Sequence, residues 1–169
     1  MIYIGIDPGQ GGALVRLSAG NAFSFARMPL HENKDVNRGQ VYDWLCKFRG
    51  LESHVFLERA IPMAMGSKHA FNYGRGFAAL EIAIEQSGIP VTYVEPAKWT
   101  KEICAGIDSN LKPKARSAIA MQRLFPHILV EVPKGKTGKL HDGVVDALLI
   151  AEYGRRLLGG KSGCDSTGT

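Results

Sequence analysis

The sequence predicts one α/β domain with a mixed five-stranded sheet, in which an antiparallel N-terminal part joins parallel strands and helices flank the sheet. Three observations favour this fold class. Apolar residues alternate with other residues at the start of the chain, where Ile2, Ile4 and Ile6 would share one face of a strand. Short apolar runs recur at 54–58 and 91–95. Stretches with helical spacing separate these runs, as in parallel crossovers.

The N-terminal part is predicted to be a three-stranded antiparallel meander. Strands are expected at 2–7, 13–17 and 22–28. A Pro-Gly-Gln-Gly-Gly turn separates the first two strands, and a Ser-Ala-Gly-Asn turn separates the second from the third.

The rest of the chain is predicted to alternate between helices and strands. Helices are expected at 37–49, 70–87, 96–104, 113–124 and 141–158, between and after strands at 54–58 and 91–95. Asn37 suits a helix N-cap, Gly88 a helix stop and Pro96 a first helical turn. Residues 128–132 are expected to form a small strand or coil. The domain should span 1–158, followed by a disordered Gly/Ser/Thr-rich tail at 159–169.

Composition places the chain among ordinary globular proteins, with 45% hydrophobic and 22% charged residues in 169. No stretch approaches the roughly 18–20 apolar residues that span a bilayer, and the N-terminus lacks the features of a signal peptide. The three cysteines are widely spaced without a Cys-x-x-Cys pair, which argues against disulfides or structural zinc. We therefore expect a soluble cytoplasmic protein with no membrane partner.

Positive charge gathers in one part of the chain. Residues 96–140 carry nine Lys or Arg against three Asp or Glu, which gives this segment a charge of +6. The whole chain has a net charge of +5, so the remainder carries about −1. A localised basic stretch is what binding to nucleic acid requires. A solvated lysine-rich surface would explain the charge alone equally well.

Four acids are candidates for a metal centre. Asp7 ends the first strand and Glu58 ends the fourth, at the sheet edge where ligands gather in α/β proteins. Asp142 and Asp146 are four residues apart, so they would project from one face of the last helix. Carboxylate clusters suit Mg²⁺, with Mn²⁺ as an alternative, and two such ions can cleave a phosphodiester. The pattern predicts a metal-dependent nuclease.

Three of the acids also have structural explanations. Asp7 fits an Asp-Pro-Gly turn, Glu58 could pair with the adjacent arginine, and Asp142 could cap its helix. Asp146 is harder to explain, because it lies within an apolar run where an unpaired charge is costly. His141 could be a cap, a partner of the metal ligands or a proton carrier.

At these residues the chain resembles the RuvC-like branch of the RNase H-like nucleases, over about residues 1–158. The matching segments are Gly5-Ile6-Asp7-Pro8-Gly9, Val55-Phe-Leu-Glu58, a helix with Gly74-Arg75-Gly76, Val94-Glu95-Pro96-x-x-Trp99-x-Lys101, Lys114, and His141-Asp142-Gly-Val-Val-Asp146-Ala147. The pattern looks most like phage or prophage versions of the family. It implies an RNase H-like fold and a Holliday junction resolvase.

The same resemblance implies the metal ligands Asp7, Glu58, Asp146 and one of His141 or Asp142, around two Mg²⁺ ions. The family usually spaces its two helix ligands by three residues. Here Gly143 occupies that position and the carboxylate is four residues before Asp146.

Several residues are candidates for contacts with nucleic acid. They are Phe71, Arg75, Lys98, Trp99, Lys101, Lys112, Lys114 and Arg116. Lysines near a helix N-terminus favour phosphate binding. Trp99 could stack on a base or belong to the core. The resemblance places Phe71 in a stretch that works at a DNA branch point, where an apolar side chain can wedge between bases. Phe71 could also pack under its own helix, and Met63 and Met65 could form a dimer contact.

The leading hypothesis is therefore a metal-dependent endonuclease that cleaves branched DNA as a homodimer, since two-fold symmetry would match two symmetric strands. An RNase H-like exonuclease with the same acids is the main alternative. A sugar-kinase or actin-like nucleotide binder also begins with Gly-Ile-Asp-x-Gly but needs two lobes. A DNA-binding module without catalysis is the remaining alternative.

Overall fold

The computed structural model describes residues 1–59, 66–127 and 141–159. Its strands are β1 (Ile2–Asp7), β2 (Ala13–Ser18), β3 (Phe23–Arg27), β4 (Ser53–Glu58) and β5 (Val91–Val94). Its helices are α1 (Arg38–Cys46), α2 (Ser67–Ser87), α3 (Pro96–Ile103), α4 (Pro113–Leu124) and α5 (Asp142–Gly159).

The five strands form one mixed sheet in the order β3-β2-β1-β4-β5. The β1–β2 and β2–β3 pairs are antiparallel, whereas β1–β4 and β4–β5 are parallel. This confirms the predicted fold class, an antiparallel meander extended by two parallel strands.

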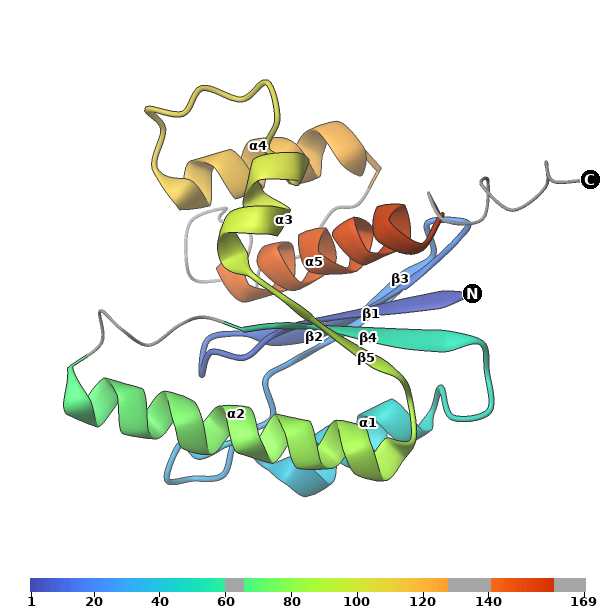
Figure 1. The fold of residues 1–169 in the computed structure, drawn as a ribbon, viewed down its shortest axis with the longest axis vertical. Helices are drawn as coiled ribbons and strands as arrows, with labels where there is room; N and C mark the ends of the chain where they lie inside the picture. Colours follow the sequence, from blue (N-terminus) through green and yellow to red (C-terminus); the bar gives the residue numbers. More distant parts are fainter. Residues whose placement is uncertain (60–65, 128–140, 160–169) are drawn as a thin grey trace, which may run out of the picture.

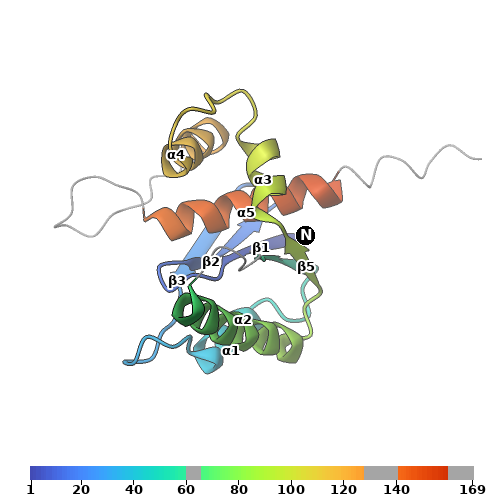
Figure 2. The same ribbon diagram turned by 60° about the vertical axis from the view of Figure 1, so that its left-hand side comes forward.

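Helices cover both faces of the sheet (Figures 1 and 2). On one face α1 and α2 pack against the strands, and on the other α5 crosses the sheet with α3 and α4 outside it. Each face has its own apolar core, one including Leu45 and Leu80 and the other including Leu148 and Trp99. No helix in the described ranges is long and apolar enough to cross a membrane.

Local signals set most element boundaries. The Asn37 side chain accepts a hydrogen bond from the backbone N–H of Gln40 (3.1 Å), as expected of an N-cap. Gly88 ends α2 with φ of 72°, the left-handed conformation in which a residue without Cβ is favoured.

Two boundaries differ from the prediction by three residues, and the others differ by at most one. Helix α2 begins at Ser67 rather than 70, and α1 ends at Cys46 rather than near 49, because turns take over where Phe48 N–H bonds to the Leu45 carbonyl. The expected strand or coil at 128–132 and the expected tail beyond Gly159 lie outside the described residues.

Strand alternation decides which way the acids face. In β1, Ile4 and Ile6 belong to the core under α1 and α2, whereas Gly5 lies against α5. Because successive side chains point to opposite faces, Asp7 follows Gly5 toward α5. Glu58 likewise lies on the α5 face, where it meets α3. Two strand-end acids are thus directed at the helix that carries Asp146.

Glycine makes the contact between β1 and α5 possible. A Cβ at position 5 would lie 2.0 Å from the Ala147 carbonyl oxygen and 2.6 Å from the Ala151 nitrogen. Both are backbone atoms of α5, so a side chain could enter only if the helix moved away from the sheet. Gly154 similarly lies against the Phe56 ring, 2.3 Å from where its Cβ would be.

Gly5→Ala is expected to lower the free energy of unfolding by about 3 kcal/mol, because backbone atoms cannot yield to an added methyl group as a flexible side chain does. Denaturant unfolding followed by circular dichroism would measure this. Gly20→Ala is the control, because nothing lies within 4 Å of the added Cβ there. Equal stability of the two variants would contradict the proposed close contact.

Candidate active site

Three acids from separate elements come together beside the carboxyl ends of the parallel strands. Asp7 ends β1, Glu58 ends β4 and Asp146 lies in the second turn of α5. The charges of Asp7 and Asp146 act on Glu58, and that of Asp7 acts on Asp146. The structure therefore brings together the two predicted strand-end acids and the helix acid.

Among the described residues, each of the three carboxylates accepts a hydrogen bond from a different element. The Gly9 N–H donates to Asp7 Oδ1 (3.2 Å), inside the turn that follows β1. The Trp99 indole N–H donates to Glu58 Oε1 (2.8 Å) from α3. Ser117 of α4 hydrogen-bonds to Asp146. The acids are thus oriented by the β1–β2 turn and by the two helices packed outside α5.

Burial and mutual repulsion disfavour the charged forms of these acids. Burial raises the pKa of Glu58 to about 7, opposed by the Trp99 N–H and reinforced by the charges of Asp7 and Asp146. Burial likewise raises the pKa of Asp146 to about 6, against the Ser117 hydrogen bond. The pKa of Asp7 is raised by burial and lowered by the Gly9 N–H and by His141.

Asp142 occupies the rim of this group. Its side chain is 50% exposed and pairs with the Lys114 ammonium at 2.5 Å. This ion pair joins the first turn of α4 to the first turn of α5. Its charge contributes to raising the pKa of Asp146, so the two helix acids interact. The predicted role of Asp142 as a ligand stays a prediction, with its carboxylate held by a lysine here.

His141 lies close enough to Asp7 and Asp142 for their charges to act on it. Burial and the charge of Arg27 lower its pKa, while Asp142 and Asp7 act in the opposite direction. Its Nδ1 is buried without a hydrogen-bond partner among the described residues. An imidazole with an open nitrogen beside two acids can serve as a ligand or a hydrogen-bond partner, so the alternatives from the sequence remain open.

The donor set is suited to a hard cation. The three partly buried side chains offer only oxygen, the ligand type preferred by Mg²⁺ and Mn²⁺. A cation would also relieve the repulsion that adds to the effect of burial on the pKa values of Glu58 and Asp146. Within residues 1–59, 66–127 and 141–159, no three carboxylate, imidazole or thiol groups already enclose a metal-sized site. Binding an ion would therefore require these side chains to rotate toward one another.

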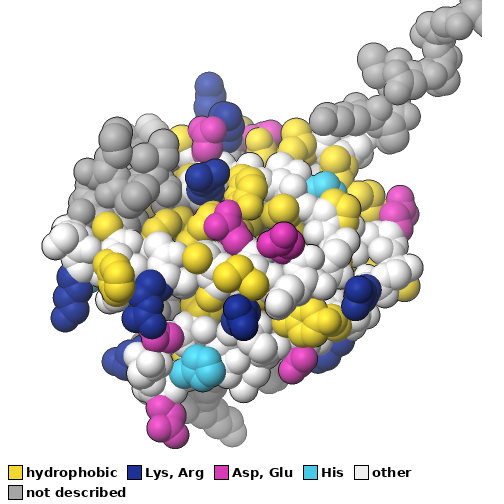
Figure 3. Space-filling model, turned by 60° about the horizontal axis from the view of Figure 1, so that its bottom comes forward, with side chains coloured by type: hydrophobic (Ala, Val, Ile, Leu, Met, Phe, Trp, Pro, Cys, Tyr) yellow, Lys and Arg dark blue, Asp and Glu magenta, His cyan; other side chains and the backbone are white. Residues whose placement is uncertain are grey.

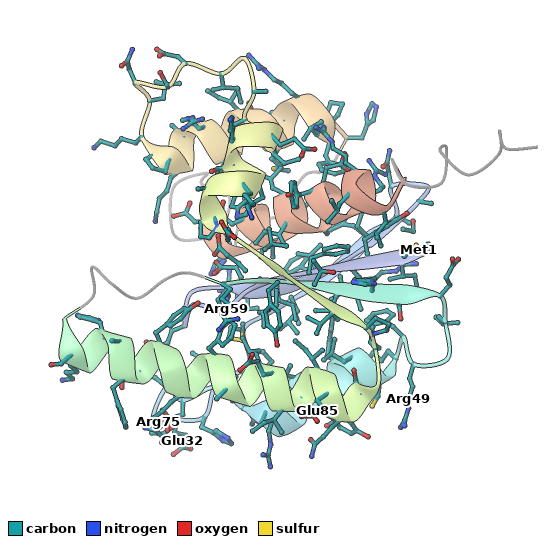
Figure 4. All side chains as sticks on the ribbon, viewed as in Figure 1. Met1, Glu32, Arg49, Arg59, Arg75 and Glu85 are labelled. Atoms are coloured by element: carbon teal, nitrogen blue, oxygen red, sulfur yellow. The ribbon has the colours of Figure 1, made fainter. Side chains whose placement is uncertain are left out.

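Glu58 does not use the adjacent arginine as its partner. The Arg59 guanidinium lies 5.3 Å from the centre of the Tyr93 ring, on the side of the sheet nearer α2 (Figure 4). The simple ion pair considered from the sequence is therefore not formed.

Trp99 corrects one expectation. Its side chain is 3% exposed within the core around α5, and its N–H is engaged by Glu58. The ring therefore presents no free face to a nucleotide base, and the core alternative is the one that the structure supports.

The remaining basic candidates differ in their exposure to solvent and in whether they already form an ion pair. Lys101 and Lys112 are exposed, and Lys98 is exposed but pairs with Glu95 at 2.8 Å. Arg116 is only partly exposed, and its Nε is buried without a partner among the described residues. Lys134, Lys136 and Lys139 of the basic segment lie outside the described residues.

Phe71 is 64% exposed on α2, so it does not pack under its own helix. The guanidinium of Arg75 lies 5.7 Å from the centre of its ring and pairs with Asp35 at 2.6 Å. Met63 and Met65, the other candidates in this stretch, lie outside the described residues.

Sequence reasoning missed Ser117. A serine inside a helix is unremarkable alone, but Ser117 lies three residues after Lys114 and so shares its helix face. That spacing could have placed both near the last helix. The hydrogen bond between Trp99 and Glu58 had no comparable signal, because it depends on how α3 packs.

Asp146→Asn is expected to stabilise the protein by about 2 kcal/mol at about pH 8 in EDTA, because the charged form is disfavoured by burial. The penalty is present above the folded-state pKa of about 6 and fades toward the ordinary value of 3.8, so the difference should shrink as pH falls. Thermal unfolding across this pH range would show it. A less stable variant at about pH 8 would sink the idea.

No family model matches the chain, and no curated protein matches its sequence. Solved structures do match its fold. Thermus thermophilus RuvC in complex with a Holliday junction substrate is 18% identical, with a TM-score of 0.61 over 96% of both chains. Another Thermus thermophilus RuvC structure is 20% identical, with a TM-score of 0.58 over 95% of this chain and 97% of the other. The chain therefore has the RNase H-like fold seen in RuvC.

Proposed function

We propose that this protein is a metal-dependent DNA endonuclease that cleaves phosphodiester bonds in branched DNA, of the Holliday junction resolvase type. The observation that carries the proposal is the convergence of Asp7, Glu58 and Asp146, three partly buried acids, at one edge of a RuvC-like sheet. Bringing three like charges together in a partly buried site disfavours folding and has no structural benefit in itself, which points to function.

Asp7, Glu58 and Asp146 would hold Mg²⁺, or Mn²⁺ in its place, with Asp142 or His141 as the fourth ligand. Two ions in such a site activate a water molecule and stabilise the leaving oxygen of a phosphodiester. The chain itself supplies orientation, since Trp99 and Ser117 fix two of the carboxylates.

The substrate would be held by exposed cations around the acids. Lys114 is 76% exposed at the rim, where its ammonium can exchange Asp142 for a phosphate oxygen. Lys101 and Lys112 lie exposed on the same side of the sheet, on α3 and at the start of α4. A homodimer would present two such sites to the two symmetric strands of a junction.

A cleavage assay on a four-way junction, a duplex, a single strand and an RNA–DNA hybrid tests the proposal. Paired symmetric nicks in the junction, dependent on Mg²⁺, are expected. Ladder-like degradation from the ends would instead favour an exonuclease with the same acids. Absence of cleavage on all four substrates with Mg²⁺ or Mn²⁺ would overturn the proposed activity.

Asp7→Asn is expected to reduce Mg²⁺-dependent cleavage more than about a hundredfold, because loss of a direct ligand should exceed the effect of losing an outer partner. Asp43→Asn is the control, since Asp43 is an exposed acid on α1, on the other face of the sheet. Full activity of Asp7→Asn would remove the basis of the mechanism.

Trp99→Phe is expected to raise the Mg²⁺ concentration needed for half-maximal cleavage by about tenfold. The change keeps an aromatic ring in the core but leaves the Glu58 carboxylate without its donor. Trp44→Phe is matched to it, because Trp44 is also buried but packs against Phe48 under the opposite face. A positioning role predicts a shifted Mg²⁺ requirement for Trp99→Phe alone, whereas equal shifts in both variants would indicate only general loosening.

A further inference from the structure

A groove lies beside the turn that follows Asp7, which we call the catalytic turn (residues 8–12). Pro8 and Gly9, which follow Asp7, form one end of a cavity of about 590 Å³ between α2 and the loop at 29–37. Gly9 is the residue whose N–H holds the Asp7 carboxylate. The groove therefore adjoins the turn that orients Asp7. Asp7, Glu58 and Asp146 are not among its described lining residues, and it lies on the α2 side, away from the lysines of α3 and α4.

Contacts at both ends fix the loop that forms one wall. Gln10 Nε2 donates to the Lys34 carbonyl oxygen (3.1 Å), which ties the loop to the catalytic turn. Arg75 pairs with Asp35 at 2.6 Å, which ties it to α2. Lys34 itself has φ of 65°, a conformation that a residue with a side chain rarely adopts without such restraint.

Glycine in α2 lets the loop approach the helix. A Cβ at Gly76 would meet the Val36 side chain at 3.3 Å, a tight contact. Glycine inside a helix costs about 1 kcal/mol relative to alanine, and here that cost accompanies a closely fitted groove wall. Arg75 and Gly76 of the Gly74-Arg75-Gly76 segment, noted in the sequence, thus line this groove.

The lining offers hydrogen-bond donors and positive charge. Lys34 and Arg75 contribute two cations, of which Arg75 is paired with Asp35, and Gln10, Asn72 and two histidines contribute polar groups. Asp35 is the one acid in the described lining, and it is already paired with Arg75. Acidic and basic side chains are interspersed on the face of the molecule drawn in Figure 3. The donors are therefore a local feature and not part of a uniformly basic face.

We propose that this groove binds a short unpaired stretch of the DNA strand that enters the active site, with Lys34, Asn72 and Arg75 contacting its phosphates. The proposal rests on the proposed nuclease function. A cavity of this size accepts a molecule of about one or two nucleotides and is too small for a duplex. The groove would thus select substrates in which a strand is unpaired next to the cleaved bond.

The test uses one variant from each wall. Lys34→Asn removes a charge, and asparagine tolerates the left-handed backbone at this position. Asn72→Asp places a negative charge in the groove from exposed α2. Arg49→Gln is the control, since Arg49 is exposed and lies at the opposite end of the molecule from Arg75 (Figure 4).

Binding is measured by fluorescence anisotropy in EDTA, with a fork that has unpaired arms and with a fully paired duplex of the same sequence. Both groove variants are expected to weaken fork binding by about three- to tenfold, as loss of one phosphate contact does, and to leave duplex binding unchanged. Lys34→Asn should also reduce the slope of the logarithm of the fork-binding constant against the logarithm of the salt concentration by about one. Arg49→Gln should match the wild type on both probes.

Fork binding like that of the wild type in both variants, or equal weakening on fork and duplex, would overturn the groove proposal while leaving the nuclease intact. A change in oligomeric state in sedimentation would also overturn it, because the groove would then be a contact between copies of the chain. If the wild type neither binds nor cleaves any DNA, the proposed function itself fails, which separates the two outcomes.

Discussion

The direct contact of α5 with β1 is the constraint on which the rest of the structure depends. Because residue 5 has no side chain, the α5 backbone at Ala147 and Ala151 lies against the strand itself. That proximity brings Asp146, one residue before Ala147, over the end of β1, where Asp7 follows Gly5 onto the same face. A thicker interface would separate the carboxylates and leave two unrelated surface acids.

The same contact makes the site unfavourable for the stability of the protein. Partly buried acids that lie close to one another acquire raised pKa values. One hydrogen bond to each, together with the charges of His141 near Asp7 and Lys114 near Asp146, opposes this effect. Apolar residues at these positions would pack without this repulsion. Functional sites are often built at such a cost to stability. The surrounding core of large aliphatic side chains supplies the stability that the acids remove.

Features with local signals could be predicted from the sequence, and features that depend on packing could not. The strand-end positions of Asp7 and Glu58 follow from period-two alternation, and the helix limits at Asn37 and Gly88 follow from capping. The burial of Trp99 against Glu58 depends on how α3 lies across α5, which no local pattern encodes. The groove likewise depends on a loop and a helix more than thirty residues apart in sequence.

The spacing of the helix acids follows from the same contact. The resemblance to RuvC-like nucleases implies a metal ligand three residues before Asp146, but a Cβ at Gly143 would lie 2.2 Å from the Gly11 carbonyl oxygen. Accommodating a side chain there would displace the turn whose Gly9 N–H holds Asp7. The carboxylate stands instead at Asp142, where the positive end of the α5 dipole and Lys114 both favour a negative charge. Close packing of the turn on α5 therefore excludes the shorter spacing and places the fourth acid at the rim.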